Sequence, residues 1–216
     1  ADENRANVYW GLEVLKKQQR PGLKALMAVA GIEPGQVNAR HLGFGLGPRM
    51  NAAGRLETAQ HALNMLVACD GLAALEASEK LEELNVKRRS IQDAIFEEAC
   101  QQAEELADDR VLVVSSDGWN HGVIGIVASK LVEKYKKPVF IIGERGEEAT
   151  GSARSFGDFS AADAVRAADD IIIKGGGHRA AAGVTLATGK IGDFRRRVNE
   201  FYDSLQLTNQ ERYLLP

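Results

Sequence analysis

The chain has 216 residues, of which 44% are hydrophobic and 26% are charged. This balance is typical of an ordinary globular protein and excludes a disordered or disulfide-built chain. The formal net charge of −3 excludes a global positive field that would attract nucleic acid or acidic lipid, so any anion site has to be local. No apolar run approaches the ~18 residues of a membrane span, and no signal peptide opens the chain. Cys69 and Cys100 fit no metal-ligand spacing, and we expect buried thiols in a reducing cytosol.

The first part of the chain is expected to be helical. The predicted helices cover Val8–Gln18, Gly22–Ala30 after Pro21, and Ala59–Ala68. From Leu72 to Leu106, apolar residues recur mostly at intervals of three, four or seven, with no proline or glycine between them. This pattern predicts one long helix of roughly 50 Å, which would suit a connector between two bodies. A pair of helices broken near Asn85–Val86 is the alternative.

After residue 110, the pattern changes to short alternating β and α elements. Val111–Ser115 and Pro138–Ile142 are predicted strands on either side of a helix at Gly122–Tyr135, which makes a βαβ unit with parallel strands. The later elements are a turn at Gly143–Glu148, an antiparallel strand at Ala149–Phe156, a helix capped by Ser160 that ends near Ala168, strands at Ile171–Lys174 and Ala181–Ala187, and a closing helix at Ile191–Leu205. The expected fold class is therefore α/β, with a long connector helix and a mixed sheet.

A first candidate anion site lies in the stretch from Gly43 to Glu57. Between residues 34 and 56 there are three arginines and no acidic residue: Arg40, Arg49 and Arg55. Gly43, Gly45 and Gly47 would allow backbone N–H groups to approach a ligand closely, and the arginine fork suits phosphate. The alternative is a glycine-rich turn whose arginines extend their charged ends into solvent.

A second candidate site follows the first strand of the βαβ unit. Trp119 and His121 stand where that strand ends and its helix begins, which is where open α/β sheets bind ligands. Trp119 could stack on a base and His121 could bind phosphate. A tryptophan that packs a loop and a solvated histidine are the alternatives.

Two further motifs lie on predicted strands. In TGSARSF, alternation along the strand places Ser152 and Arg154 on one face, where they could grip a phosphate. The alternative is an arginine on an edge strand, paired with a surface carboxylate. In KGGGHRAAAGV, three consecutive glycines precede His178 and Arg179, and such a run usually marks a backbone that something else touches. A tight hairpin turn is the alternative here.

The four motifs NAAGRLE, GWNHGVIGIVASKL, GSARS and GGGHRAAAG, in this order, closely resemble the carboxy-terminal portion of RecJ, the single-strand-specific exonucleases of the DHH phosphoesterase superfamily. The likeness runs from Glu3 to about Phe201. It implies a DHH domain that holds two divalent metals, a long connector helix, and a DHH-associated domain that clamps nucleic acid. The implied division is residues 1–71 for the end of the DHH-side domain with the NAAGR motif, 72–106 for the connector, 107–205 for the DHH-associated domain and 206–216 for a tail.

The resemblance also implies a set of binding residues. The expected substrate- and phosphate-binding residues are Asn51, Arg55, Trp119, His121, Ser152, Arg154, Gly176, Gly177 and His178, and the glycine run with His178 is expected to face the metal centre. Many relatives read GWHxG, so the histidine of this chain lies one position later. No Asp-His-His triplet occurs, so we expect no catalytic residue and no bound metal in this chain, with Mn²⁺ or Mg²⁺ bound elsewhere in the intact enzyme. His41 and His61 are interpreted as structural or surface residues.

The expected function is the substrate-clamping part of a RecJ-like 5′-to-3′ single-stranded DNA exonuclease, which acts in DNA repair and recombination. We expect a cytoplasmic monomer whose partner is single-stranded DNA, with a single-strand-binding protein or a helicase as a candidate cellular partner. One alternative is a DHH phosphoesterase for short oligonucleotides or cyclic dinucleotides. Another is a non-catalytic nucleic-acid-binding module, comparable to the related domain appended to alanyl-tRNA synthetases.

Overall fold

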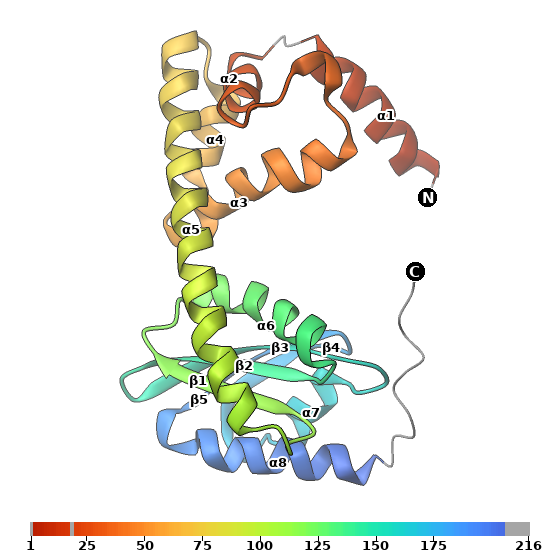
Figure 1. Cartoon of the computed structure of the whole chain (residues 1–216), viewed down its shortest axis with the longest axis vertical. Helices are drawn as coiled ribbons and strands as arrows, with labels where there is room; N and C mark the ends of the chain where they lie inside the picture. Colours follow the sequence, from red (N-terminus) through yellow and green to blue (C-terminus); the bar gives the residue numbers. More distant parts are fainter. Residues whose placement is uncertain (1, 18–19, 206–216) are drawn as a thin grey trace. The chain divides into compact units, whose positions relative to one another are not determined.

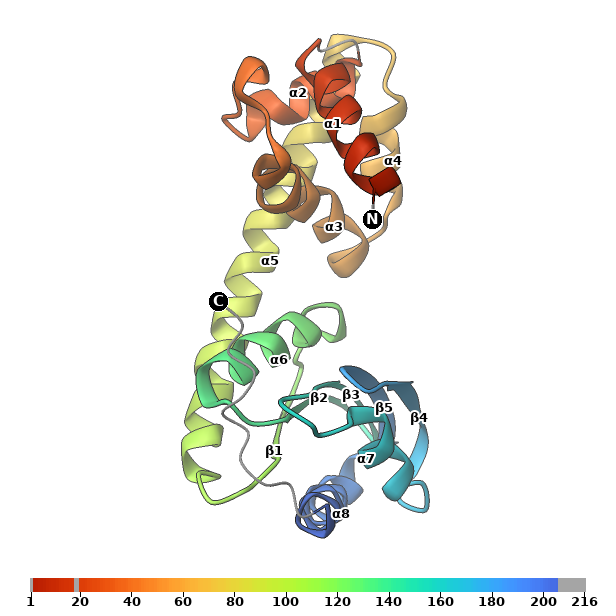
Figure 2. The same cartoon turned by 90° about the vertical axis from the view of Figure 1, so that its right-hand side faces the viewer.

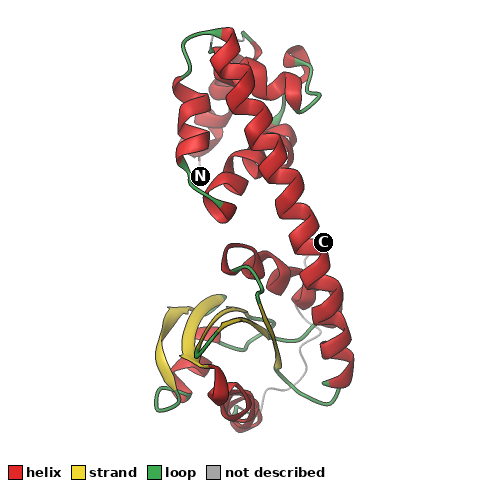
Figure 3. Ribbon diagram, turned by 90° about the vertical axis from the view of Figure 1, so that its left-hand side faces the viewer, coloured by secondary structure: helices red, strands yellow, loops and turns green. Residues whose placement is uncertain are grey.

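The computed structural model describes residues 2–17 and 20–205. Gln18, the expected end of the first helix, and the expected tail at 206–216 lie outside the described residues. The chain divides into two compact units, residues 1–90 and 91–216 (unit 1 and unit 2), and the division falls inside helix α5 (Figure 1). Within the described residues, the strands all belong to unit 2, whereas unit 1 is built from helices (Figure 3).

Unit 1 consists of short helices packed with the first part of α5. They are α1 (Asp2–Lys16), α2 (Pro21–Val29), a 3₁₀ turn η1 (Pro34–Gln36), a π-helical segment η2 (His41–Leu46), α3 (Gly47–Leu56) and α4 (Gln60–Val67). The core includes Leu26, Met27, Leu46, Met65, Leu81 and Leu84, all buried. At Gly22 a Cβ atom would overlap the Met65 carbonyl, lying 2.8 Å from its carbon. Glycine at this position therefore allows α2 to pack directly against α4.

The glycine-rich stretch after Arg40 differs from its prediction. The two interpretations of Gly43, Gly45 and Gly47 were a backbone that approaches a ligand and a glycine-rich turn, but η2 and α3 run through these residues as continuous helical structure. A Cβ atom at Gly45 would lie 2.9 Å from Ile32 Cδ1, and one at Gly47 would lie 2.9 Å from the Leu42 carbonyl oxygen. These two glycines therefore serve close packing, and the expectation of a backbone cradle for a ligand is wrong.

Helix α5 (Gly71–Glu105) is a single unbroken helix of 35 residues, as predicted. The Asp70 side chain accepts a 2.9 Å hydrogen bond from the Ala73 N–H and so satisfies one of the free donors of the first turn. The alternative of a break near Asn85–Val86 is wrong. Asn85 is buried within the helix, where its side chain accepts a hydrogen bond from Arg88.

Unit 2 is built on a five-stranded mixed sheet in the order β1-β2-β3-β5-β4. Its elements are β1 (Leu112–Asp117), α6 (His121–Tyr135), β2 (Val139–Arg145), β3 (Glu148–Arg154), α7 (Ala161–Ala167), β4 (Ile172–His178), β5 (Ala181–Ala187), a 3₁₀ turn η3 (Thr188–Lys190) and α8 (Ile191–Ser204). β1 and β2 are parallel, as the predicted βαβ unit requires, and the other neighbouring strands are antiparallel. The predicted α/β class, with a long helix and a mixed sheet, is confirmed.

The sheet of unit 2 is covered differently on its two faces. Helix α6 lies on one face over β2 and β3, whereas α7 and α8 cover the other face (Figure 2). The α7–α8 side holds the larger core, in which Phe140 and Phe194 meet edge to face with their ring centroids 5.1 Å apart. Because α6 covers the β2–β3 side, the β5–β4 part of the same face stays exposed at Gly176 and Gly183.

Several local predictions can be compared with these elements. Ser160 caps α7 as expected, since its side chain accepts a hydrogen bond from the Asp163 N–H. The turn predicted at Gly143–Glu148 is shorter than expected, because β2 runs to Arg145 and β3 begins at Glu148. The triple glycine lies inside β4 and not in a turn.

The two cysteines differ in burial. Cys100 is buried as expected, but Cys69 is exposed, so the prediction of two buried thiols is wrong for Cys69. Cys69 follows the end of α4 and precedes the start of α5, a connection that leaves it at the surface. Among the described helices, none combines the length and the apolar character that a membrane crossing requires.

Candidate functional site

The pair of Ser152 and Arg154 on β3 forms the first part of the site. Arg154 Nη1 donates to Ser152 Oγ at 3.1 Å and to the Ala153 carbonyl at 2.8 Å, so the two side chains share one face as predicted. β3 lies inside the sheet between β2 and β5. Within residues 2–17 and 20–205, no carboxylate forms an ion pair with Arg154. The alternative of an edge-strand arginine with a surface carboxylate is therefore wrong.

Helix α6 packs directly over this pair at Gly125. A Cβ atom there would lie 3.1 Å from Ser152 Oγ and 3.3 Å from Arg154 Nη2. The missing side chain thus leaves space for the hydroxyl and the guanidinium under the helix. Sequence reasoning missed Gly125, although a glycine inside a helical pattern is a signal of close packing.

The same sheet face continues across β5 to β4. In the strand register, Ser152 stands opposite Gly183, which stands opposite Gly176. Arg154 stands opposite Ala181, which stands opposite His178. Residues that stand opposite each other in neighbouring strands share a face of the sheet. Arg154 and His178 therefore lie on either side of the β5 strand on this face, two strand spacings or roughly 9.5 Å apart.

Packing explains two of the three glycines in β4 and leaves the third unexplained. A Cβ atom would lie 2.5 Å from Val165 Cγ1 at Gly175 and 2.5 Å from Ala182 Cα at Gly177. At Gly176, apart from its chain neighbours, no heavy atom of the described residues lies within 4 Å of that position. Gly176 is therefore free of steric constraint from the described residues, and it faces the same exposed surface as Gly183.

We define the glycine trough as this exposed surface. Gly183 and Gly176 form its floor in the row of Ser152, and Ala181 lies between Arg154 and His178 in the next row. The trough lacks side chains along its floor, and it carries a hydroxyl, a guanidinium and an imidazole. A guanidinium next to a hydroxyl suits a phosphate group, and a floor of glycines admits a bulky ligand to the backbone. Gly177 supports β4 by its packing and does not face the floor.

The residues predicted near the end of β1 lie away from the trough. Trp119 is only 5% exposed, and its indole N–H donates to Glu98 Oε2 at 2.7 Å. A buried ring offers no face to a base, so the expected stacking role of Trp119 is wrong. His121 begins α6, and its Nε2 lies 3.1 Å from the carbonyl oxygen of Gly143. Gly143 pairs with Thr150, which lies four residues, or roughly 13 Å, along β3 from Arg154.

Asn51 and Arg55 lie in unit 1 on helix α3. They are four residues apart, so they share one side of the helix, and both are exposed. Arg49 is different, because its guanidinium contacts the Glu82 carboxylate of α5 and donates to the Gly45 carbonyl at 2.8 Å. The fold therefore brings an acidic residue, Glu82, next to the stretch between residues 34 and 56, which has no acidic residue of its own. Arg49 is an intramolecular anchor and not part of a three-arginine anion site.

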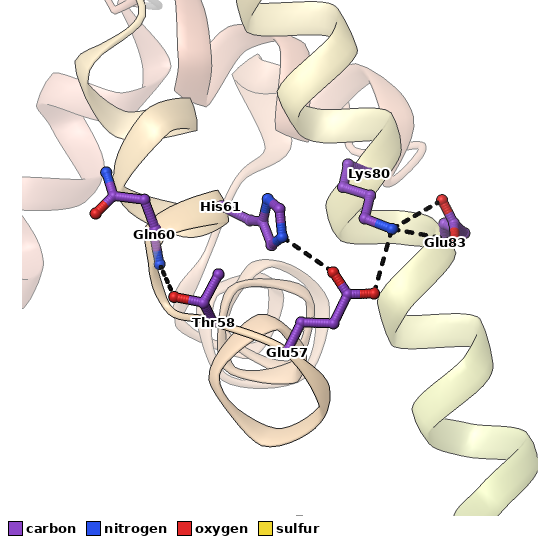
Figure 4. Close-up of polar contacts among 6 residues, drawn as sticks. All are labelled: Glu57, Thr58, Gln60, His61, Lys80 and Glu83. Atoms are coloured by element: carbon purple, nitrogen blue, oxygen red, sulfur yellow. Dashed lines mark hydrogen bonds and ion pairs between the residues drawn. The ribbon is translucent and has the colours of Figure 1, made fainter.

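The carboxylate of Glu57, directly after α3, joins three helices (Figure 4). Its Oε2 lies 3.0 Å from His61 Nε2 on α4, and its Oε1 lies 3.4 Å from Lys80 Nζ on α5. Lys80 also contacts Glu83, at 3.2 Å. Burial raises the pKa of Glu57, but the hydrogen bonds and charges of Lys80 and His61 lower that pKa below its ordinary value.

The two histidines interpreted as structural or surface residues have different surroundings. His61 takes part in the Glu57 contacts at the surface of unit 1. His41 begins η2, and its Nδ1 atom is buried without a hydrogen-bond partner among the described residues. Within the described part of the chain, no three His, Cys, Asp or Glu side chains lie close enough together to hold a metal ion.

The comparisons with known proteins agree with the resemblance seen in the motifs. Residues 108–204 match the DHHA1 domain. Curated relatives include the single-stranded-DNA-specific exonuclease RecJ of Bacillus subtilis, 39% identical over 206 residues, and that of Escherichia coli, 34% identical over 209 residues. These alignments cover 94% and 91% of this chain but only 26% and 36% of the relatives. The chain therefore spans well under half the length of these proteins.

Solved structures give the same result. The RecJ of Thermus thermophilus in complex with Mn²⁺ matches with a TM-score of 0.85 at 30% identity, covering 96% of this chain and 30% of that one. A structure described as exonuclease RecJ bound to manganese matches with a TM-score of 0.84 at 30% identity, covering 98% of this chain and 52% of that one. The predicted resemblance to RecJ is confirmed.

Proposed function

We propose that this chain is the substrate-clamping part of a single-strand-specific DNA exonuclease, since residues 108–204 match the DHHA1 domain and nearly the whole chain is similar to part of RecJ. The longer protein would release nucleotides in the 5′-to-3′ direction during repair and recombination. Within it, this chain would bind the sugar-phosphate backbone and leave bond cleavage to residues outside it.

The glycine trough is the single observation that supports this proposal most directly. A single strand presents one phosphate per nucleotide, and a guanidinium with an adjacent hydroxyl can bind one of them through several hydrogen bonds. Arg154 is held toward Ser152 and has no ionic partner among the described residues. Its charge is therefore available to an anionic ligand. Gly176 and Gly183 would allow the strand to lie close to the sheet.

Asn51 and Arg55 supply a second proposed contact from unit 1. Both side chains are exposed on one side of α3, where an amide and a guanidinium can both donate to phosphate oxygens. The overall charge of −3 weakens non-specific attraction to DNA, so binding should depend on these local groups. We retain His178 as a phosphate contact, and we drop Trp119 because its ring is buried.

The proposal assigns no metal to this chain. RecJ structures contain Mn²⁺ or Mg²⁺, but the described residues offer no group of ligands that fits a divalent ion. The contribution of this chain to catalysis would therefore be to bind and position the strand. Action as a cytoplasmic monomer, with a single-strand-binding protein or a helicase as a partner, also belongs to the proposal and is supported by the resemblance alone.

The proposal is tested by substituting Arg154 in the intact protein that contains this chain. We expect Arg154→Ala to weaken binding to a 5′-phosphorylated single strand by about tenfold, the loss of one charged contact. Arg145→Ala is the matched control. Arg145 is an exposed arginine at the last position of β2, where it pairs with Glu148 at the end of β3 opposite to Arg154. Equal affinities of the two variants would contradict the assignment. A preference for short oligonucleotides or cyclic dinucleotides would instead favour the small-substrate phosphoesterase.

A further inference from the structure

We infer that Glu57 is a positioning residue, which fixes the end of helix α3 so that Arg55 is held in place for a phosphate. This inference rests on the proposed role of Arg55 in binding the strand. Glu57 has no direct role in that binding, since its carboxylate repels phosphate. Its contacts are with α4 and α5, and its effect would reach the ligand through α3.

The backbone of Glu57 ties its side chain to the last turn of α3. Its N–H donates to the Ala53 carbonyl at 2.9 Å, while its φ of −134° and ψ of −97° turn the chain out of the helix. Arg55 is two residues earlier, within the same turn. Helix ends fray because their last carbonyls lack partners in the helix, so an anchored side chain at this position restrains the turn that carries Arg55.

The carboxylate uses both oxygens, and each one contacts a different helix. Oε2 contacts His61 on α4 at 3.0 Å, and Oε1 contacts Lys80 on α5 at 3.4 Å (Figure 4). Two contacts in different directions restrict rotation of the helix end more than one contact would. The charges around Glu57 lower the pKa of this carboxyl group below its ordinary value, so it stays ionised when both contacts form.

The other end of α3 is anchored independently. Arg49, in the first turn, contacts Glu82 of α5, and both side chains are largely shielded from water, at 15% and 26% exposure. Arg49 and Glu57 thus hold the two ends of the helix, and the exposed side with Asn51 and Arg55 lies between them. Loss of the Glu57 contacts would leave the Arg49 end in place and weaken the restraint on the turn that carries Arg55.

The contacts of Glu57 should affect strand binding more than they affect the global stability of the protein. The side chains of Glu57, His61 and Lys80 are 30–37% exposed, and ion pairs at such sites contribute little to global stability. A displacement of about 1 Å at a binding group can nevertheless cost much of its effect. Substitution of Glu57 should therefore change strand binding while the melting temperature stays nearly the same.

The test compares Glu57→Ala with Glu83→Ala in the intact protein, by the affinity for a 5′-phosphorylated, fluorescently labelled single strand in EDTA. Glu83 is the matched control, because it also contacts Lys80 but belongs to α5 and not to the end of α3. Both variants remove one negative charge. Electrostatics alone predicts that each of them binds DNA slightly more tightly. If Glu57 positions Arg55, Glu57→Ala should instead bind DNA more weakly, with an affinity about three- to fivefold lower.

A double substitution shows whether Glu57 acts through Arg55. If it does, Glu57→Ala should cause no further loss in a protein that already carries Arg55→Ala. Glu57→Gln should recover part of the affinity, since the amide oxygen can still accept one of the two hydrogen bonds. If Glu57→Ala binds like Glu83→Ala, or if the losses of Glu57→Ala and Arg55→Ala add, the inference is overturned. If Arg55→Ala itself keeps full affinity, the proposed function of α3 fails instead.

Discussion

The three glycines of β4 allow a prediction in which neighbouring substitutions have opposite effects. A Cβ atom added at Gly176 meets no heavy atom of the described residues within 4 Å, apart from its chain neighbours, and β-branched residues are favoured in strands. Gly176→Val should therefore keep or raise stability, by up to about 1 kcal/mol, because glycine in a strand carries an entropic cost. If the strand lies in the glycine trough, the same variant should bind single-stranded DNA about tenfold more weakly.

Gly175→Ala and Gly177→Ala should have the opposite effects, because they should lower stability and not block the floor of the trough. The new Cβ atoms would lie 2.5 Å from Val165 Cγ1 and from Ala182 Cα, respectively. Overpacking of this kind costs about 1–3 kcal/mol, and more where backbone has to move, as at Gly177. For a chain of this size, this corresponds to a melting temperature lower by about 2–12 °C.

The assay pairs thermal unfolding with strand affinity measured by fluorescence anisotropy. Gly189→Val is the control. A Cβ atom at Gly189 also meets no heavy atom of the described residues within 4 Å, apart from its chain neighbours, but Gly189 lies in η3, outside the trough. The reasoning is refuted if Gly176→Val melts as early as Gly177→Ala, or if it binds the strand as tightly as Gly189→Val does.

Three further predictions concern single sites. Gly22→Ala should destabilise unit 1 by about 3 kcal/mol in denaturant unfolding, because its Cβ atom would overlap a backbone carbonyl of α4. In the native protein, a thiol reagent should modify the exposed Cys69 quickly and the buried Cys100 only on unfolding; equal rates would contradict the assigned burial. The hydrogen bond from Arg197 lowers the pKa of Asp170 below its ordinary value. The stabilisation from this contact is therefore complete above the ordinary pKa of the carboxyl group and is lost as the pH falls through the lowered pKa. Asp170→Asn should therefore reduce the loss of stability on acidification, as followed by circular dichroism.

Much of the fold could be predicted because it depends on local periodicity. The apolar spacing and the absence of proline and glycine predicted the unbroken α5, and the apolar runs around residues 111–142 predicted the parallel βαβ unit. Ser160 was recognisable as a cap because capping depends on a contact three residues away. In these cases the information lies within a short window of sequence.

The site was harder to predict because its residues acquire their roles through distant contacts. Arg49 appeared free in a stretch without acidic residues, yet Glu82, 33 residues later, neutralises it. Trp119 stands at a position where ligands often bind, but Glu98 of α5 holds its indole in the interior. The separate roles of Gly175, Gly176 and Gly177 follow from strand register, from the neighbouring strand β5 and from helix α7 behind the sheet, none of which can be read from a run of identical residues.

The two glycine-rich motifs illustrate the same limit. Glycine permits both an open backbone for a ligand and a close approach between elements, and the sequence does not distinguish these uses. Gly45 in η2 and Gly47 at the start of α3 accommodate Ile32 and Leu42, so these two glycines serve close packing. In β4, only Gly176 is left open by the described residues.

The central claim is that this chain holds the strand and that the metal-dependent chemistry belongs to the rest of a longer protein. The most direct test compares this chain and the intact protein on 5′-phosphorylated single-stranded DNA with Mn²⁺, measuring nucleotide release and strand affinity together. The account predicts nucleotide release by the intact protein alone, with affinity that depends on Arg154 in both. Release of nucleotides by the isolated chain would show that its own residues bind the metal, and it would contradict the account.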